Sequence, residues 1–237
     1  MIQLQNITKT YTKGKKKAVD DLTLHVEGGE LFGFIGPNGA GKTTTIKLMT
    51  GILSPDQGTI TMAGHRMDQD RLAAQRLIGF VPDGNDLYDR LTGMEYLNFM
   101  ADVYQVDAAR RKAHIEKYLE IFELQDAINS QVRTYSKGMK QKLVVIGALI
   151  HNTPVWILDE PLVGLDPRAA HLLKEEMIRH CREGNTVLPA LQWRIISSFS
   201  RCAARGSRPP RGSSRIHTGG LWIRAPMTTS FCFIPFE

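Results

Sequence analysis

Residues 31–43 read Leu-Phe-Gly-Phe-Ile-Gly-Pro-Asn-Gly-Ala-Gly-Lys-Thr, an apolar run that leads into a loop of the form G-x-x-x-x-G-K-[ST]. A strand followed directly by this loop is the context in which the pattern binds phosphate groups. Glycines let successive backbone N–H groups turn toward an anion, and the helix predicted from Thr44 to Met49 points the positive end of its dipole at the same place. The stretch therefore predicts a nucleoside triphosphate site made by Gly36, Pro37, Asn38, Gly39, Ala40, Gly41, Lys42, Thr43 and Thr44.

Charged and hydroxyl side chains at two places in the sequence indicate how the triphosphate would be used. Lys42 supplies positive charge for the β- and γ-phosphates, and the Thr43 hydroxyl is a ligand for Mg²⁺. Asp159 and Glu160 follow Val155–Leu158, an all-apolar stretch of the kind buried in a parallel sheet. Because an unpaired buried carboxylate is costly, we expect Asp159 to face Mg²⁺ and Glu160 to orient or deprotonate the attacking water. The alternative is that both acids only cap the next helix.

The remaining elements predict an α/β fold: a P-loop NTPase parallel-sheet core with an N-terminal antiparallel β portion and an inserted helical subdomain. Thr92–Glu95 has the pattern of a capping box and begins a helix that runs to about Tyr104. The charged loop Lys13–Lys17 is interpreted as the solvated connection between two strands. Strand-like stretches occur at residues 2–4, 22–26, 59–62, 78–81, 155–158 and 186–188.

These elements divide the chain into four parts. Residues 1–83 and 153–188 are expected to form the nucleotide-binding core, and residues 84–152 the helical subdomain. Residues 189–237 form a C-terminal tail of different composition, with seven Arg, no Lys and one acid, whereas basic and acidic residues balance in the part before it. The whole excess of the formal charge of +6 therefore belongs to the tail, and it is no sign that the core binds nucleic acid.

A second turn that leads into a helix lies at Tyr135–Gln141, Tyr-Ser-Lys-Gly-Met-Lys-Gln. Its free amides and the Ser136 hydroxyl are suited to bind another anion. One chain with a complete phosphate loop needs no second γ-phosphate site of its own, so this turn is interpreted as serving a nucleotide held by another subunit. An ordinary helix cap is the alternative.

Composition excludes several classes of protein. The longest apolar stretch, Leu143–Ile150, is much shorter than the roughly 20 residues of a membrane helix, and the first residues do not resemble a secretion signal. The three cysteines and seven histidines lack the spacings of disulfide frameworks or zinc sites. We expect a soluble protein of a reducing cytosol, whose membrane role, if any, comes from a partner.

The motifs Gly36–Thr43, Tyr135–Gln141, Leu158–Pro161 and Gly164–Pro167, in this order, closely resemble the nucleotide-binding subunit of ATP-binding cassette (ABC) transporters over residues 1–188. The resemblance implies an ATPase whose two copies, or a copy and a paired ABC subunit, enclose two ATP molecules with Mg²⁺ between them. It also implies a membrane-spanning permease partner, a place on the inner face of the cell membrane, and no nucleic-acid partner. The form of the second and fourth motifs is similar to that of bacterial exporters.

The same resemblance implies roles for single residues. Tyr11 corresponds to the aromatic residue that stacks on adenine, Ser136 and Gly138 to the contacts with the partner's γ-phosphate, and Asp166 to an acid at the dimer contact. Asp83 stands where the family usually has Gln, which contacts Mg²⁺ and the attacking water; a carboxylate can bind the metal but lacks the amide donor. Gln192 stands where the family has its switch histidine and cannot carry a positive charge.

Two further interpretations stay open beside a transport ATPase. One is a nucleotide-binding but catalytically impaired remnant of such a subunit. The other is a non-transport ABC protein of translation or DNA repair. The single phosphate loop and the lack of heptads argue against this second interpretation. The abrupt change after Leu188 favours a tail translated out of frame over an evolved basic tail. An out-of-frame tail is expected to leave the edge of the sheet uncovered.

Overall fold

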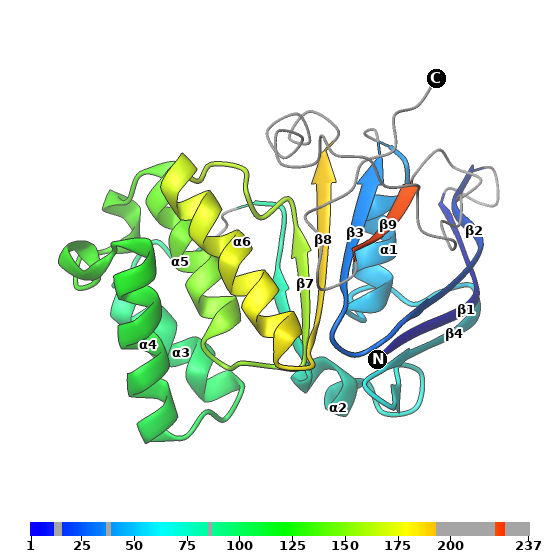
Figure 1. The fold of residues 1–237 in the computed structure, drawn as a ribbon, viewed down its shortest axis with the longest axis horizontal. Helices are drawn as coiled ribbons and strands as arrows, with labels where there is room; N and C mark the ends of the chain where they lie inside the picture. Colours follow the sequence, from blue (N-terminus) through cyan, green and yellow to red (C-terminus); the bar gives the residue numbers. More distant parts are fainter. Residues whose placement is uncertain (12–15, 37–38, 85–86, 193–220, 226–237) are drawn as a thin grey trace.

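The computed structural model describes residues 1–11, 16–36, 39–84, 87–192 and 221–225, and their strands form two sheets. One sheet has four strands in the order β2-β1-β4-β5, and the other has five in the order β6-β7-β8-β3-β9. Figure 1 shows the five-stranded sheet in the middle of the molecule, between a group of helices and the four-stranded sheet. The predicted α/β fold with an antiparallel portion and a helical part is confirmed.

The four-stranded sheet is antiparallel throughout. It comprises β1 (Ile2–Tyr11), β2 (Lys16–Val26), β4 (Gln57–Met62) and β5 (His65–Arg66). Its first two strands are longer than their sequence patterns indicate, because register shifts along the β1–β2 pair interrupt the strict alternation of apolar residues. The expected loop at 13–17 is too long, because Lys16 and Lys17 belong to β2, although the Lys17 side chain is exposed as predicted; residues 13–15 lie outside the described residues.

The five-stranded sheet contains the strand that precedes the phosphate loop. Its parallel strands are β3 (Leu31–Gly36), β6 (Ile78–Val81), β7 (Val155–Asp159) and β8 (Thr186–Gln192). All five residues of β7 are buried, which agrees with the apolar sequence of Val155–Leu158 and with helices on both faces of the sheet, and the last of the five is Asp159.

The C-terminal part of this sheet differs from the expectation. The pattern of β8 was expected to end at Leu188, but the strand continues to Gln192, with Ala190 opposite Phe34 of β3 and opposite Asp159 of β7. The edge of β3 is not uncovered, because β9 (Leu221–Ala225) pairs with it in antiparallel register. Backbone pairing places few demands on side-chain type, so a segment without a clear sequence pattern can still extend a sheet.

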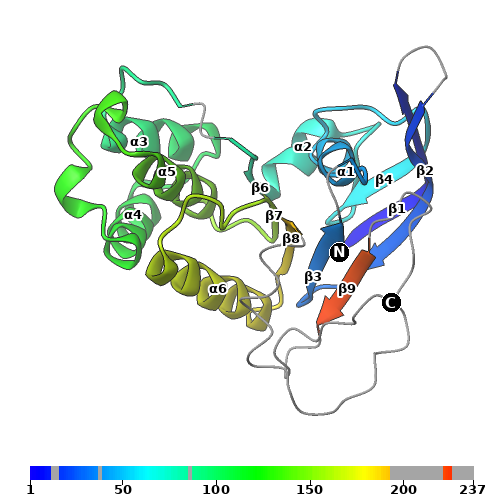
Figure 2. The ribbon, with the colours of Figure 1, turned by 90° about the horizontal axis from the view of Figure 1, so that it is seen from above.

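Helices cover both faces of the five-stranded sheet. α1 (Lys42–Met49) lies between the two sheets and contacts strands of both, and α6 (Pro167–Arg182) packs on the opposite face against β3 and β8 (Figure 2). The short α2 (Arg71–Arg76) lies beside β6. This arrangement directs the start of α1 toward the carboxyl ends of the parallel strands, the usual location of ligand sites in such folds.

The other helices share one hydrophobic cluster with α6 and one face of the five-stranded sheet. They are α3 (Gly93–Val103), α4 (Ala108–Phe122) and α5 (Lys137–Leu149), with short 3-10 turns η1 (Gln125–Ala127) and η2 (Val132–Thr134) between the last two. The capping box predicted at Thr92 and Glu95 is present in full. The Tyr104 hydroxyl donates to the Ile78 carbonyl oxygen at 3.1 Å and so joins this unit to β6. In the described part of the chain, every helix is too short or too polar to cross a membrane.

Candidate functional site

The phosphate loop connects β3 to α1, as predicted. Gly36 ends β3 and lies opposite Gln192 of β8, so the backbone at position 192 borders the loop; Pro37 and Asn38 lie outside the described residues. Gly41 has φ 86°, and a Cβ atom there would stand 2.5 Å from the Ala18 carbonyl oxygen. Only glycine fits this position, because the left-handed backbone and the close approach of β2 both exclude a side chain.

The side chain of Lys42 is held inside the site. It is 6% exposed at the first position of α1. Burial lowers the pKa of its ammonium group, and the neighbouring Glu160 and Asp159 carboxylates oppose that change. The two acids therefore favour the charged form of Lys42, and in a region of low dielectric the attraction between an ammonium group and a phosphate is strong.

A pocket of about 430 Å³ opens above the phosphate loop. Tyr11 lies at this pocket with its side chain 41% exposed, so the structure brings β1 to the site although the two are far apart in sequence. Lys17 and Ala18 also line it, and sequence reasoning missed them; the register Thr10↔Lys17 places them beside Tyr11, which a longer hairpin would have indicated. The lining consists of Tyr11, Lys17, Ala18, Gly39, Gly41, Lys42, Thr43, Thr44, Asp83 and Glu160, whereas the predicted Ala40 is buried.

Asp159 lies at the base of the site, 3% exposed at the end of β7. Burial raises the pKa of its carboxyl to about 6; the hydrogen bond from the Thr43 hydroxyl acts in the opposite direction, and the nearby Asp83 and Glu160 raise it further. The predicted neighbours Thr43 and Asp159 are therefore in contact. A carboxyl with this pKa gains strongly from a cation beside it.

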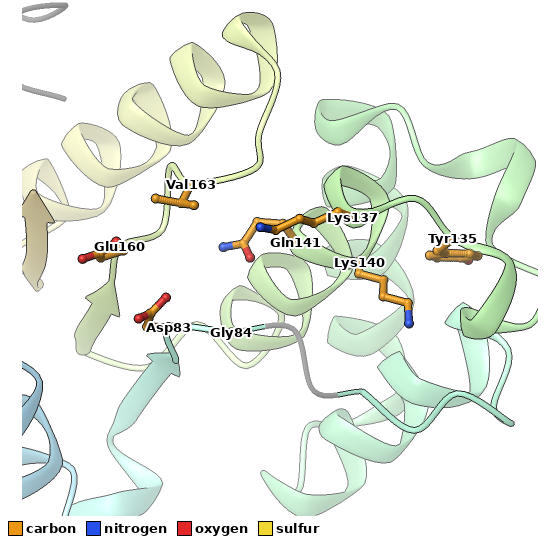
Figure 3. Close-up of a pocket in the computed structure, with 8 residues that line it drawn as sticks. All are labelled: Asp83, Gly84, Tyr135, Lys137, Lys140, Gln141, Glu160 and Val163. Carbon is orange, nitrogen blue, oxygen red and sulfur yellow. The ribbon is translucent and has the colours of Figure 1, made fainter. Parts of the chain in front are cut away.

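A second pocket, of about 420 Å³, continues from the first toward the helical unit. Figure 3 shows Asp83 and Glu160 at one end of it and side chains from the start of α5 at the other. The first pocket shares both acids, so they lie between the phosphate loop and α5. Asp83 is exposed at the end of β6, and Glu160 is half-buried with its N–H bonded to the Ala190 carbonyl oxygen at 3.0 Å.

The start of α5 is formed by the predicted turn. Ser136 is exposed at the N-cap, and its hydroxyl accepts a hydrogen bond from the Met139 N–H at 3.2 Å. Gly138 lies against the loop that follows β7, where a Cβ atom would be 3.0 Å from the Gly164 carbonyl oxygen. Asp166 caps α6 through the Ala169 N–H at 2.8 Å. The turn thus caps its own helix and also faces outward, so both interpretations of Ser136 remain compatible with its position.

The residues at the site fit Mg²⁺ bound together with a nucleotide. Among the described residues there is no group of three or more His, Cys, Asp or Glu that could hold a metal ion. Mg²⁺ in nucleotide sites needs fewer protein ligands, because it keeps several waters and binds phosphate oxygens. The hydroxyl of Thr43 and the carboxylate of Asp159 can both provide oxygen ligands for Mg²⁺, and the two groups are in contact beside the phosphate loop. Asp83 lies near them.

Comparisons with known proteins agree with this geometry. Residues 19–163 match the ABC transporter family. The chain is 37% identical over 187 residues to the Nod factor export ATP-binding protein I of Paraburkholderia xenovorans (strain LB400), covering 79% of this chain and 61% of that protein. It is 36% identical over 191 residues to the ABC transporter ATP-binding protein NatA of Bacillus subtilis (strain 168), covering 79% of this chain and 78% of that protein. The chain thus spans about three-fifths of the length of the first of these relatives.

A solved structure is also similar. It is a dimeric ATP-binding cassette in a post-hydrolysis state bound to ADP and Pi, with a TM-score of 0.71 and 25% identity, covering 81% of this chain and 88% of that one. The matched family residues include the phosphate loop, the start of α5, and Asp159 and Glu160 at the end of β7. This chain therefore belongs to the ABC transporter family.

Proposed function

We propose that this chain is the ATP-binding and ATP-hydrolysing subunit that powers an ABC exporter. The observation that carries the proposal is the shared position of Asp83 and Glu160, which line both the phosphate-loop pocket and the pocket at the start of α5. The two carboxylates lie at the junction of the pockets, where the γ-phosphate of a nucleotide bound by Lys42 would be attacked by water. The printed names of the relatives, an export ATP-binding protein and a transporter ATP-binding protein, support the same role.

The nucleotide would lie along the first pocket. The exposed Tyr11 ring at its rim offers a flat apolar surface for the adenine base. The backbone N–H groups of the phosphate loop and the Lys42 ammonium group would hold the β- and γ-phosphates. Thr43 and Asp159 would hold Mg²⁺, with Asp83 nearby. When bound, this ion neutralises negative charge on the phosphates.

Hydrolysis requires a group that accepts the proton of the attacking water. Glu160 is half-buried, its N–H is bonded to the Ala190 carbonyl oxygen, and it lines both pockets; its carboxylate would accept that proton as the water attacks the γ-phosphorus. The bond between the γ-phosphorus and the bridging oxygen then breaks, and ADP and phosphate leave. Asp83, at the same junction, would orient the water.

A second copy, or a paired ABC subunit, would complete the site. Ser136 and Gly138 lie at an outward-facing helix start, which is suited to contact a γ-phosphate held by the neighbour. The dimeric state of the similar cassette structure supports this arrangement. The nucleotides would then lie between the phosphate loop of one subunit and the α5 start of the other.

The permease would dock on an apolar groove between α2 and α3, which would place the subunit on the inner face of the membrane. Leu72 is 71% exposed there, Ile52 55% and Val103 54%, which is unusual for large apolar side chains so close together. The groove measures about 400 Å³ and is lined by Thr50, Ile52, Leu72, Gln75, Arg76, Ile78, Phe80, Val103 and Tyr104.

A catalytically impaired subunit is the second candidate function. It is favoured by Gln192, which lies opposite Gly36 at the position of the family's switch histidine and cannot carry a positive charge. ATP binding without measurable turnover in the unmodified chain would select this candidate. The substitution Gln192→His should then raise turnover, and the coding DNA read in another frame after codon 188 should restore a histidine near this position.

The test of the main proposal is Glu160→Gln. The variant should bind ATP as the parent does, lose hydrolysis by about 100-fold or more, and form an ATP-dependent dimer visible by light scattering. Glu175→Gln, an exposed acid on α6, is the matched control and should change none of these. Hydrolysis by Glu160→Gln at the parental rate would overturn the assignment of Glu160.

The docking groove has its own test. Leu72→Glu should abolish co-purification with the permease but leave ATP binding by the isolated subunit intact. Ile178→Glu changes another exposed apolar residue, 37% exposed on α6, and serves as the control that should retain the permease. Equal retention of the permease by both variants would move the docking surface elsewhere.

A further inference from the structure

Lys17 lies on the wall of the phosphate-loop pocket, between the aromatic rim and the loop. The residue before it, Lys16, pairs with Tyr11 in the register of β1 and β2. The residue after it, Ala18, has its carbonyl oxygen 2.5 Å from the place that a Cβ atom of Gly41 would take. Lys17 is therefore the single residue between a position paired with the rim and a position packed on the loop, and it lines the same pocket.

The charges of the pocket are distributed in two groups. Among the lining residues that the structure describes, the cations are Lys42 and Lys17. Lys42 has Glu160 and Asp159 as its neighbouring acids. Lys17 has an acid of its own, Asp20, whose Oδ1 atom lies 2.7 Å from the Lys17 Nζ. An ammonium group carries three N–H donors and no acceptor, so the bond to Asp20 leaves donors that can reach an anion in the pocket.

The pair of Lys17 and Asp20 is a weak reason for a lysine at this position. The Lys17 side chain is 55% exposed and the Asp20 side chain 39%, and water screens the attraction between charges that are so exposed. The pair therefore contributes little to the stability of the fold, and the Lys17 side chain can turn toward a ligand at small cost.

The position of Lys17 selects one part of a bound nucleotide. If the base stacks on Tyr11 and Lys42 holds the β- and γ-phosphates, the part between them is the ribose and the α-phosphate. N–H donors bind ionised oxygens more strongly than neutral hydroxyls, which favours the phosphate. We propose that Lys17 binds the α-phosphate and so sets the affinity of the site for ATP and ADP alike. This inference rests on the proposed function.

Isothermal titration of the isolated subunit tests the contact from the side of the protein. Lys17→Met should weaken the binding of ATP and of ADP by the same factor, about 5-fold at low salt. Lys17→Arg keeps the charge and should stay within about 2-fold of the parent. In about 0.5 M salt the loss in Lys17→Met should shrink to less than about 2-fold, because salt screens partly exposed charges.

Changes in the nucleotide test which group Lys17 contacts. The affinities for 2′-deoxy-ATP and 3′-deoxy-ATP should fall in Lys17→Met by the same factor as the affinity for ATP, because the α-phosphate is present in all three. A loss that disappears with either deoxynucleotide would place the contact on the ribose and overturn the inference. A loss for ATP that is absent for ADP would place it on the γ-phosphate, with the same consequence.

Lys9→Met provides the matched control. Lys9 lies on β1 of the same strand pair and forms a 2.7 Å pair with Asp56, with side chains 18% and 41% exposed. Because Lys9 is more buried than Lys17, a purely structural effect of losing a lysine would be larger in Lys9→Met, which should instead bind ATP as the parent does. Equal losses in both variants, or unchanged binding in Lys17→Met, would overturn the inference alone. A parent chain that binds neither ATP nor ADP would overturn the proposed function and the inference with it.

Discussion

The two helix starts that face the proposed phosphates, those of α1 and α5, differ in how their free N–H groups are satisfied. The N-cap of α1 is Gly41, in the left-handed conformation and without a side-chain cap bond, whereas the N-cap of α5 is Ser136, whose hydroxyl accepts from Met139. The first helix leaves its amides for a ligand, and the second satisfies one of them itself. The difference indicates that the start of α1 binds phosphate within its own chain, whereas the start of α5 is a surface that contributes to the site of a neighbouring subunit.

Substitution of the first lysine of each helix is expected to give the largest difference, a difference in the ATP affinity of the monomer. Lys42 is buried among acids, whereas Lys137 is exposed. Lys42→Ala should weaken ATP binding by the monomer at least about 100-fold, because a desolvated charge on the phosphates is lost. Lys137→Ala should change the same affinity by no more than about 2-fold. Isothermal titration of both variants with ATP and Mg²⁺ measures this, and equal losses would remove the distinction between the two sites.

Substitution of the glycines at the two helix starts should give the next largest difference, in the free energy of unfolding. Gly41→Ala forces a side chain into a left-handed position 2.5 Å from a backbone oxygen and should destabilise the chain by about 4 kcal/mol. Gly138→Ala meets the Gly164 oxygen at 3.0 Å without a left-handed backbone, so a shift of the loop should limit its effect to about 1 kcal/mol. Urea unfolding of the two variants compares them directly, and a larger effect at Gly138 would contradict the geometry.

The acids beside the two helices should affect stability with opposite signs. The pKa of Asp159 is raised from 3.8 to about 6, so the folded state loses stability as pH rises from about 4 to about 6. Without nucleotide, Asp159→Asn should therefore be more stable than the parent by up to about 3 kcal/mol at pH 7.5, with the gain vanishing near pH 4. Hydrolysis should be lost.

Asp166→Asn is the counterpart near α5. The pKa of Asp166 is lowered, so its contribution is present at neutral pH and disappears as pH falls below its ordinary value. This variant should be slightly less stable than the parent at pH 7.5 and equal to it in acid. Difference curves of unfolding free energy against pH remove the contribution of groups distant from each acid, and curves of the same sign would refute the assignment.

Local sequence patterns determined the elements of the site. The strand up to Gly36, the caps at Thr92 and Ser136, and the buried stretch before Asp159 each depend on neighbours a few residues away, and the structure has them as predicted. The limits of β1, β2 and β8 were less predictable, since register shifts and backbone pairing extend strands beyond their apolar pattern.

The sequence by itself thus determined which residues can bind phosphate and which helix starts and strands carry them, because those properties arise from backbone conformation and side-chain chemistry within one element. Only the tertiary structure decided which of them meet. The order β6-β7-β8-β3-β9 places β8 between β7 and β3, and so brings Gln192 beside Gly36 and Glu160 against Ala190. The proximity of Lys17 to the phosphate loop and the Lys142–Asp166 pair are likewise long-range contacts, which depend on how packed elements lie in space and leave no periodic signal in the chain.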